Sequence, residues 1–140
     1  MPVHRIRLLG PWEFAWDRSV GGETPLVTEG TTAMPCDWHS LFGSVVGTAT
    51  FRRRFHRPSN LEPHERVLLI CTGVRGRGTV SLNDEQLSVF ASDGEAVECE
   101  VTSRLQPFNV VSIRLSAGAI EEPQPPGGLF EPVVLEIRSE

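Results

Sequence analysis

The sequence contains no lysine, so arginine supplies all 13 of its basic residues. Aspartate and glutamate together number 18, which leaves a formal net charge of −5 and a sequence pI of about 5.4. Proteins that bind nucleic acid need a surplus of basic side chains to neutralise the phosphates. We therefore expect no nucleic-acid partner for this chain.

Long apolar runs are also missing. No stretch of the sequence approaches the roughly 20 apolar residues that span a bilayer. The N-terminal sequence MPVHRIRLLGPWEF lacks the continuous apolar core of a signal peptide. We expect a cytoplasmic protein that has no membrane partner.

Cysteine is also scarce. The three cysteines are Cys36, Cys71 and Cys99, and they form no Cys-x-x-Cys motif. An odd number of widely spaced cysteines makes a disulfide framework unexpected. Cys71 and Cys99 fall on the apolar side of expected strands, where a thiol packs as a small hydrophobic group. The four histidines are scattered along the chain, so we predict no metal site.

Recognisable catalytic motifs are absent as well. The sequence has no Gly-x-Ser-x-Gly elbow, no Gly-x-Gly-x-x-Gly run and no phosphate-binding loop. Cys36 lies in an expected loop, and the sequence places no histidine to activate its thiol. The acidic pair Glu121-Glu122 lies in a Pro-rich segment, where we interpret it as a solubilising charge. We expect a protein that is not an enzyme and that holds no cofactor.

Alternation of apolar and polar residues is the main pattern that is present. It occurs near residues 4–8, 12–16, 51–55, 67–71, 80–82, 97–101, 111–115 and 133–137. A period of two is the signature of strands that bury one face. Seven to nine such strands with irregular connections predict an all-β fold, an antiparallel β-sandwich, in a single domain over residues 1–140.

The shorter connections are predicted from glycine and from turn-forming residues. Gly73, Gly76 and Gly78 interrupt the centre of the chain and predict a bend between two strands. A turn is expected at Asn83-Asp84-Glu85.

Three longer connections are predicted where the alternation stops. Residues 18–48 are expected to form a long covering loop, with one helical turn near residues 40–42. A loop is expected over residues 90–95, and a break before the next strand over residues 103–109.

A set of short fragments occurs in a recognisable order along nearly the whole chain. In chain order the fragments are LLGPWEF, MPCDWHSLFG, FRRRF, LICTGV, VSLND, VECEVTSRL, PFNVVSIRL and GGLFEPVVLEI. This order resembles the N-terminal sugar-binding domain of glycoside hydrolase family 2, found in β-galactosidases, β-glucuronidases and β-mannosidases. The resemblance implies a jelly-roll sandwich of the galactose-binding-like type.

The resemblance also carries an expectation about function. In that family the two catalytic carboxylates lie on a barrel domain that follows the sugar-binding domain and an immunoglobulin-like domain. This chain ends where those domains would begin, so the resemblance implies a free-standing, non-catalytic carbohydrate-binding module. A remnant of a longer glycosidase that no longer binds sugar is an alternative.

Two tryptophans are candidate ligand-binding residues. A carbohydrate site needs a flat aromatic ring against the apolar face of a pyranose, with a few fixed polar groups. Trp16 ends its strand and Trp38 lies in the long loop, although packing beneath that loop is the preferred interpretation of each. Asp37 and His39 flank Trp38 and are candidates for a polar rim.

A second candidate group consists of Arg75, Arg77 and Asn83, which lie beside the glycine-rich bend. Arginine forks are suited to hydrogen-bond a sugar or an acidic group. The preferred interpretation is that these are solvated loop arginines with a turn-forming asparagine.

Two other functions stay open. The domain is alternatively an interaction module for a protein partner or for a second copy of itself. This hypothesis depends on apolar strand faces at Phe51/Phe55 and Val133/Val134/Leu135, which are expected near sheet edges. The less favoured hypothesis is an enzyme whose site follows no recognised motif.

Overall fold

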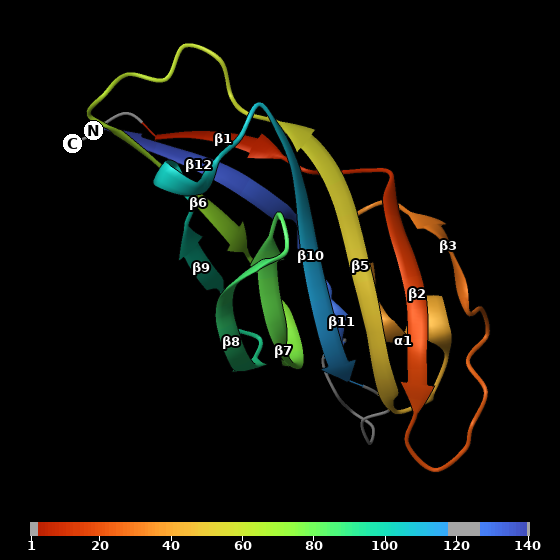
Figure 1. Cartoon of the computed structure of the whole chain (residues 1–140). Helices are drawn as coiled ribbons and strands as arrows, with labels where there is room; N and C mark the ends of the chain where they lie inside the picture. Colours follow the sequence, from red (N-terminus) through yellow and green to blue (C-terminus); the bar gives the residue numbers. More distant parts are fainter. Residues whose placement is uncertain (1–2, 118–126, 140) are drawn as a thin grey trace.

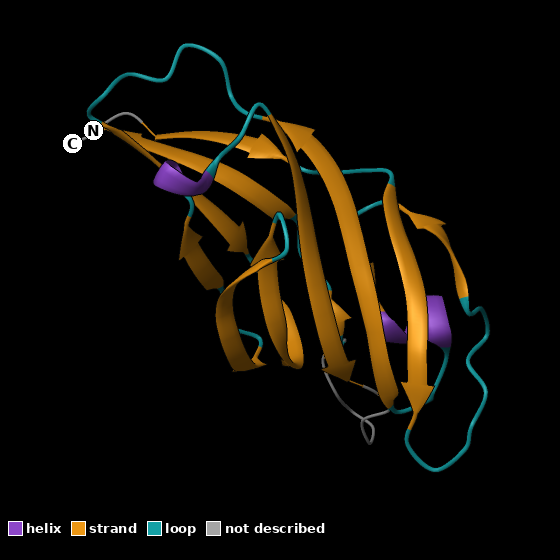
Figure 2. Cartoon of the chain, in the orientation of Figure 1, coloured by secondary structure: helices purple, strands orange, loops and turns teal. Residues whose placement is uncertain are grey.

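The computed structural model of the chain describes residues 3–117 and 127–139 (Figure 1). The pair Glu121-Glu122 lies outside the described residues. The elements in chain order are β1 (Val3–Arg7), β2 (Trp12–Ser19), β3 (Glu29–Thr32), β4 (Cys36–Asp37), α1 (Trp38–Phe42), β5 (Gly47–His56), β6 (Glu65–Cys71), β7 (Val74–Leu82), β8 (Glu85–Asp93), β9 (Val97–Glu100), the 3-10 turn η1 (Thr102–Arg104), β10 (Phe108–Ala117), β11 (Gly128–Leu129) and β12 (Val133–Ser139). Strands dominate and the helical segments are short (Figure 2).

These strands form two antiparallel sheets. The small sheet has the strand order β1-β12-β6-β9. The large sheet has the order β3-β2-β5-β10-β7-β11-β4, and β8 pairs with β7 beside this path. The long strands β2, β5 and β10 run side by side across the large sheet (Figure 1). The all-β antiparallel sandwich predicted from the alternation is therefore confirmed.

The core lies between the sheets and is filled by the apolar side chains of the alternating segments. Leu69 of β6 lies opposite Leu135 of β12, and both side chains are buried. On the large sheet, β10 contributes Val111, Ile113 and Leu115, which are fully buried. Burying an aliphatic side chain of this size contributes about 1.5–3 kcal/mol, so the alternating positions hold the two sheets together.

The glycines at the centre of the chain correct one prediction. Gly76 and Gly78 lie within β7, so the bend is confined to the short link before Val74. A Cβ atom on Gly78 would overlap the carbonyl oxygen of Arg114 on the neighbouring strand β10. These glycines therefore permit close approach of two strands, a role that glycine can have besides forming turns.

Three strands that the pattern did not predict lie in expected loops or extend into them. β3 and β4 fall within the expected covering loop, and β8 extends into the expected loop over residues 90–95. Their residues are exposed or half-buried, so none of these strands shows the alternation that reveals a buried face. The expected helical turn near residues 40–42 is confirmed as part of α1.

The turn between β7 and β8 agrees with the sequence. Asn83 and Asp84 have φ angles of 52° and 68°, and Leu82 pairs with Glu85 on either side of them. Two successive positive φ values are the geometry of a two-residue hairpin turn of type I′, in which asparagine and aspartate are favoured.

The apolar strand faces expected near sheet edges are interior instead. β5 lies between β2 and β10, and β12 lies between β1 and β6. The side chains concerned are all buried; they are Phe51, Phe55, Val133, Val134 and Leu135. Burial explains their apolar character. Val134 differs from the others because it belongs to a separate buried cluster and not to the main core.

The outer face of the small sheet carries ion pairs next to a separate apolar patch. The patch consists of Leu68, Ile70 and Val134. Glu136 lies beside it, opposite both Leu68 and Arg5 in the sheet register. Its side chain is 4% exposed and accepts a 2.7 Å bond from Nε of Arg5 and a second bond from Nε of Arg138. Two guanidinium groups thus satisfy one covered carboxylate.

This arrangement predicts a pH-dependent contribution to stability. The hydrogen bond from Arg5 lowers the pKa of Glu136 below its ordinary value near 4.5, burial opposes the shift, and Arg138 adds to it. Because the folded-state pKa is lowered, the stabilising contribution is complete above about pH 4.5 and is lost as the pH falls through the folded-state pKa. Replacing Glu136→Gln should lower the free energy of unfolding at pH 7 by about 2 kcal/mol.

Urea unfolding of the wild type and Glu136→Gln at a series of pH values would measure this effect. The difference between them should be constant above pH 5 and should shrink at lower pH. Glu23→Gln, at an exposed position, is the matched control and should unfold like the wild type. A difference that is the same at pH 3 and pH 7 would contradict the role assigned to the ion pairs.

Candidate functional site

The two tryptophans predicted as stacking surfaces pack within an aromatic cluster of the core. Trp38 is 2% exposed, and its Nε1 donates a 2.9 Å hydrogen bond to the carbonyl oxygen of Val45. Its ring lies 4.8 Å from that of Phe42 and 5.5 Å from that of Trp16, measured between centroids. Trp16 is half-buried and donates to Ser19. Trp38 therefore offers no open ring face to a ligand, and Trp16 offers only part of one.

Asp37 and His39 form hydrogen bonds at the two ends of the short helix α1. Asp37 is the N-cap residue, and its carboxylate accepts hydrogen bonds from the amide of Ser40 at 3.1 Å and from the Ser40 hydroxyl at 2.6 Å. Burial raises the pKa of Asp37, but these hydrogen bonds outweigh burial and keep the pKa below its ordinary value near 3.8. The Nδ1 atom of His39 lies 3.1 Å from the hydroxyl of Ser44.

Arg75, Arg77 and Asn83 are not brought together. They lie along β7 and just after it, so that Arg75 and Asn83 are separated by roughly 25 Å of extended chain. Arg75 forms an ion pair with Asp93 at 2.9 Å and lies 5.3 Å from the centroid of the Phe130 ring. Arg77 is exposed on the strand itself.

Asn83 ties the β7–β8 turn to the start of β10. Its Nδ2 donates to Oδ1 of Asn109 at 3.0 Å, and its Oδ1 accepts from the amide of Val110 at 2.8 Å. Asn109 is buried and exchanges two hydrogen bonds with the backbone of Gln106. These contacts of Asn83 are structural, and Asn83 also lines the second of the hollows described below.

The remaining chemistry-bearing residues offer little reactivity. Burial raises the pKa of the Cys36 thiol to about 11, so little thiolate is present at neutral pH. Within residues 3–117 and 127–139, no group of three or more histidine, cysteine, aspartate or glutamate side chains is arranged to hold a metal ion. The described part of the chain also contains no helix of the length and apolarity needed to cross a membrane.

Three adjoining hollows lie along the large sheet, the first over β3, β2 and β5, the second over β2, β5 and β10, and the third over β5 and β10. Their volumes are about 530, 500 and 440 Å³. The first and second hollows share Glu13 and Arg52, and the second and third share Arg54 and Val110. We call this continuous surface the outer trough.

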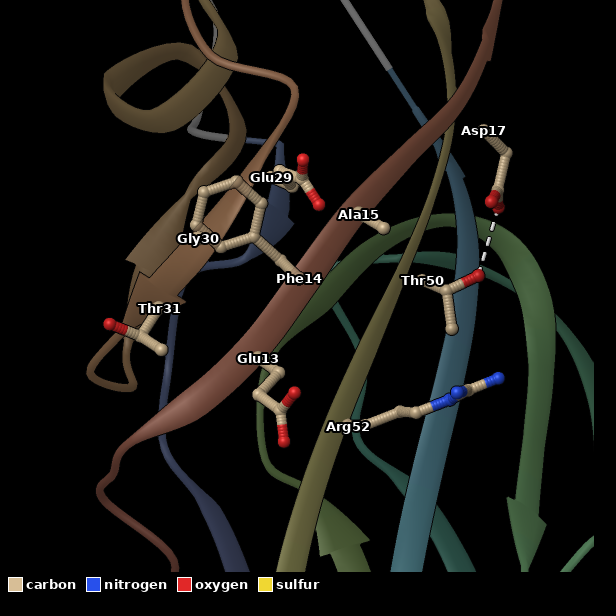
Figure 3. Close-up of a pocket in the computed structure, with 9 residues that line it drawn as sticks. All are labelled: Glu13, Phe14, Ala15, Asp17, Glu29, Gly30, Thr31, Thr50 and Arg52. Carbon is tan, nitrogen blue, oxygen red and sulfur yellow. Dashed lines mark hydrogen bonds between the residues drawn. The ribbon is translucent and has the colours of Figure 1, made fainter.

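The first hollow of the outer trough has both polar and apolar lining (Figure 3). It is lined by Glu13, Phe14, Ala15, Asp17, Glu29, Gly30, Thr31, Thr50 and Arg52. The Thr50 hydroxyl donates a 2.8 Å hydrogen bond to Asp17, whose carboxylate also lies 3.4 Å from Nε of Arg114. The small side chain of Ala15 lies opposite Thr50 in the register. Asp17 is therefore neutralised within the protein.

The second hollow contains charged side chains that have no partner. Glu13 of β2 and Arg52 of β5 lie directly opposite each other in the sheet register. Both are exposed, as is Arg54 two residues further along β5. None of these three side chains forms a hydrogen bond or ion pair with another described residue. Arg53 differs, because its guanidinium donates to the backbone carbonyl oxygens of Arg54 and Gly10.

The third hollow ends in an exposed aromatic ring. Phe108 is 72% exposed and lies opposite His56 in the pairing of β10 with β5. The two rings meet edge to face with 5.0 Å between centroids. Val110 and the buried Phe55 complete the apolar part of the lining. An aromatic platform of this kind can stack on a flat apolar surface while neighbouring polar groups bind hydroxyls.

Phe108 was absent from the sequence-based candidates, although the pattern contained a signal for it. Phe108 has the same parity as Ser112 and Arg114, which point outward, and the opposite parity to the buried Val111. The predicted break over residues 103–109 hid this relation, because β10 begins at Phe108. A large aromatic residue on the polar side of a strand is the informative exception.

Comparison with known sequences and structures gives a likeness of fold. No protein-family model and no curated protein matches the sequence. Among solved structures, an uncultured Clostridium sp. β-glucuronidase superposes with a TM-score of 0.77 at 18% identity, over 99% of this chain and 29% of that protein. An FMN-binding β-glucuronidase from Faecalibacterium prausnitzii L2-6 superposes with a TM-score of 0.76 at 20% identity, over 98% of this chain and 23% of that protein.

A third structure, a putative β-galactosidase from Bacteroides fragilis, gives a TM-score of 0.74 at 18% identity, over 99% of this chain and 24% of that protein. The chain thus spans between about a fifth and a third of the length of the solved proteins that it resembles. It has the β-sandwich fold of one part of these β-glucuronidases and this putative β-galactosidase, so the fold expected from the resemblance to glycoside hydrolase family 2 is confirmed.

Proposed function

We propose that this domain binds an extended carbohydrate along the outer trough and that it does not itself catalyse a reaction. The observation that carries the proposal is the exposed ring of Phe108 in line with the unpaired side chains of Arg54, Arg52 and Glu13. A sugar-binding surface requires these two elements, an aromatic platform for the apolar face of the ring and fixed polar groups for the hydroxyls.

The dimensions of the outer trough favour a chain of sugars over a single sugar. His56, which lines the third hollow, and Thr50, which lines the first, lie on the same face of β5, six residues apart, which corresponds to roughly 20 Å of extended strand. The three hollows follow this line without interruption, since each shares two lining residues with the next. An oligosaccharide laid along β5 and β10 would contact the aromatic platform at one end and polar groups at the other.

The comparisons support the choice of ligand class. The solved proteins that share this fold are named as β-glucuronidases and a putative β-galactosidase, and these names denote proteins that act on carbohydrates. The part of each of those proteins that resembles this chain is a minor fraction of its length. A binding role that accompanies an activity located elsewhere is consistent with that division.

Titration of the isotopically labelled protein with millimolar neutral and acidic oligosaccharides, followed by amide chemical shifts, tests the proposal. Saturable shifts are expected at the outward residues of β2, β5 and β10, with the largest near Phe108. No shift with any oligosaccharide, or shifts confined to the small sheet, would overturn the binding site. Hydrolysis of aryl glycosides by the purified protein would overturn the non-catalytic role.

Self-association is a second candidate function, favoured by a separate apolar surface around α1. The exposed apolar residues there are Val20, Leu26, Val27 and Val46. A backbone hydrogen bond of 2.7 Å joins Val20 to Val46, and one of 2.9 Å joins Leu26 to Phe42 of α1. Light scattering over a dilution series measures it, and a monomer at every concentration would exclude self-association.

A further inference from the structure

We infer that the preferred ligand of the outer trough is an acidic carbohydrate, whose ring carboxylate is bound by Arg54. This inference rests on the proposed function, because it specifies the chemistry of the sugar bound at the same site. It depends on which charges of the outer trough are already neutralised and which remain available.

Arg54 is placed where an aromatic platform and a cationic group act on the same sugar. It lines both the aromatic third hollow and the polar second hollow. In the sheet register it lies opposite Val110 of β10, so the side chain across the strand pair is apolar and uncharged. A sugar stacked on Phe108 would therefore lie in the same hollow as this guanidinium.

The guanidinium of Arg54 is free to bind a ligand. It forms no ion pair or hydrogen bond with another described residue, and its side chain is exposed. A guanidinium presents a planar fork of donors that matches the two oxygens of a carboxylate. Neutral hydroxyls would use single donors of this fork, whereas a carboxylate engages two donors together with the charge.

The acidic residues of the outer trough are divided between its hollows. Asp17, whose carboxylate is already bonded within the protein, and Glu29 line the first hollow. Glu13 and Asp84 line the second hollow together with Arg54. Neither of these two carboxylates forms a hydrogen bond or ion pair with another described residue. Each should repel an anionic ligand weakly, so removal of the Glu13 charge should strengthen binding.

A pair of oligosaccharides that differ only at C6 provides the test. The probes are a cello-oligosaccharide and the β-1,4-linked glucuronate oligosaccharide of equal length, which carries carboxylates in place of hydroxymethyl groups. Calorimetric titration of the wild type at low salt should show about tenfold tighter binding of the glucuronate, the gain typical of one charge-assisted bidentate contact.

Three variants test whether Arg54 causes the preference for the glucuronate. Arg54→Gln should lose the tenfold preference while its affinity for the neutral probe stays within about twofold of the wild type. Glu13→Gln should bind the glucuronate about two to three times more tightly. Arg7→Gln, at an exposed arginine of the small sheet, is the control for net charge and should behave like the wild type.

The possible outcomes separate the inference from the proposed function. Equal affinity of the wild type for the two probes would overturn the inference and leave carbohydrate binding in place. An equal loss of glucuronate affinity in Arg54→Gln and Arg7→Gln would also overturn it, because the effect would then follow from net charge. If neither probe bound at millimolar concentration, the proposed function itself would fail.

Discussion

Replacing Phe108→Ala is expected to weaken oligosaccharide binding by about tenfold, while the free energy of unfolding changes by less than about 0.5 kcal/mol. The ring is 72% exposed, and it meets the ring of His56 with 5.0 Å between centroids. Its removal therefore creates no cavity in the core. Calorimetry with the glucuronate oligosaccharide and urea unfolding of the same variant measure the two effects.

Two further variants make the Phe108 result specific. Phe108→Trp keeps a flat aromatic surface and should retain binding. Val89→Ala removes another exposed apolar side chain, on β8, which lines none of the three hollows, and should bind like the wild type. If Phe108→Ala bound the oligosaccharide as tightly as the wild type, the aromatic platform would have no role in recognition.

Replacing Trp38→Ala should have the opposite effects: it should lower the free energy of unfolding by about 4 kcal/mol and leave oligosaccharide binding unchanged. The indole is fully enclosed between Phe42 and Trp16, so truncation leaves a cavity. It also removes the donor to the Val45 carbonyl oxygen, and an unpaired buried carbonyl adds to the cost. Urea unfolding monitored by circular dichroism would measure the loss.

Trp38→Phe is the matched control, because it retains most of the buried ring and loses the hydrogen bond. A loss of about 1–2 kcal/mol is expected for it. Both variants should bind oligosaccharide with the wild-type affinity under conditions in which they are folded. A destabilisation below 1 kcal/mol in Trp38→Ala would contradict the packing role, and reduced binding in folded Trp38→Phe would reopen its role as a ligand-binding residue.

The alternation of apolar and polar residues predicted the strands correctly wherever a strand buries one face. The alternation around Leu69, Ile113 and Leu135 correctly predicted strands whose apolar side points into the core. It failed for β3 and β8, because strands with few buried residues leave no periodic trace. Gly76 and Gly78 were misinterpreted for a related reason, since the need for space beside β10 is invisible in the chain itself.

The residues of the candidate site were harder to predict from the sequence than the strands. Trp16 and Trp38 are the residues that composition favours for stacking, yet Trp38 is enclosed and Trp16 is half-buried against it. Arg75 and Asn83 are close in sequence and lie at opposite ends of β7. In an extended strand each residue adds about 3.3 Å, so neighbours in sequence separate quickly unless a turn returns the chain.

By itself the sequence determined the fold class and the identity of the core, because the period of two and the burial of apolar side chains are local properties. The tertiary structure decided which side chains meet on the outer face. Glu13, Arg52 and Phe108 come from β2, β5 and β10, which are far apart in the chain and adjacent in the sheet. The strand order and register that align them depend on long-range pairing, which no single segment specifies.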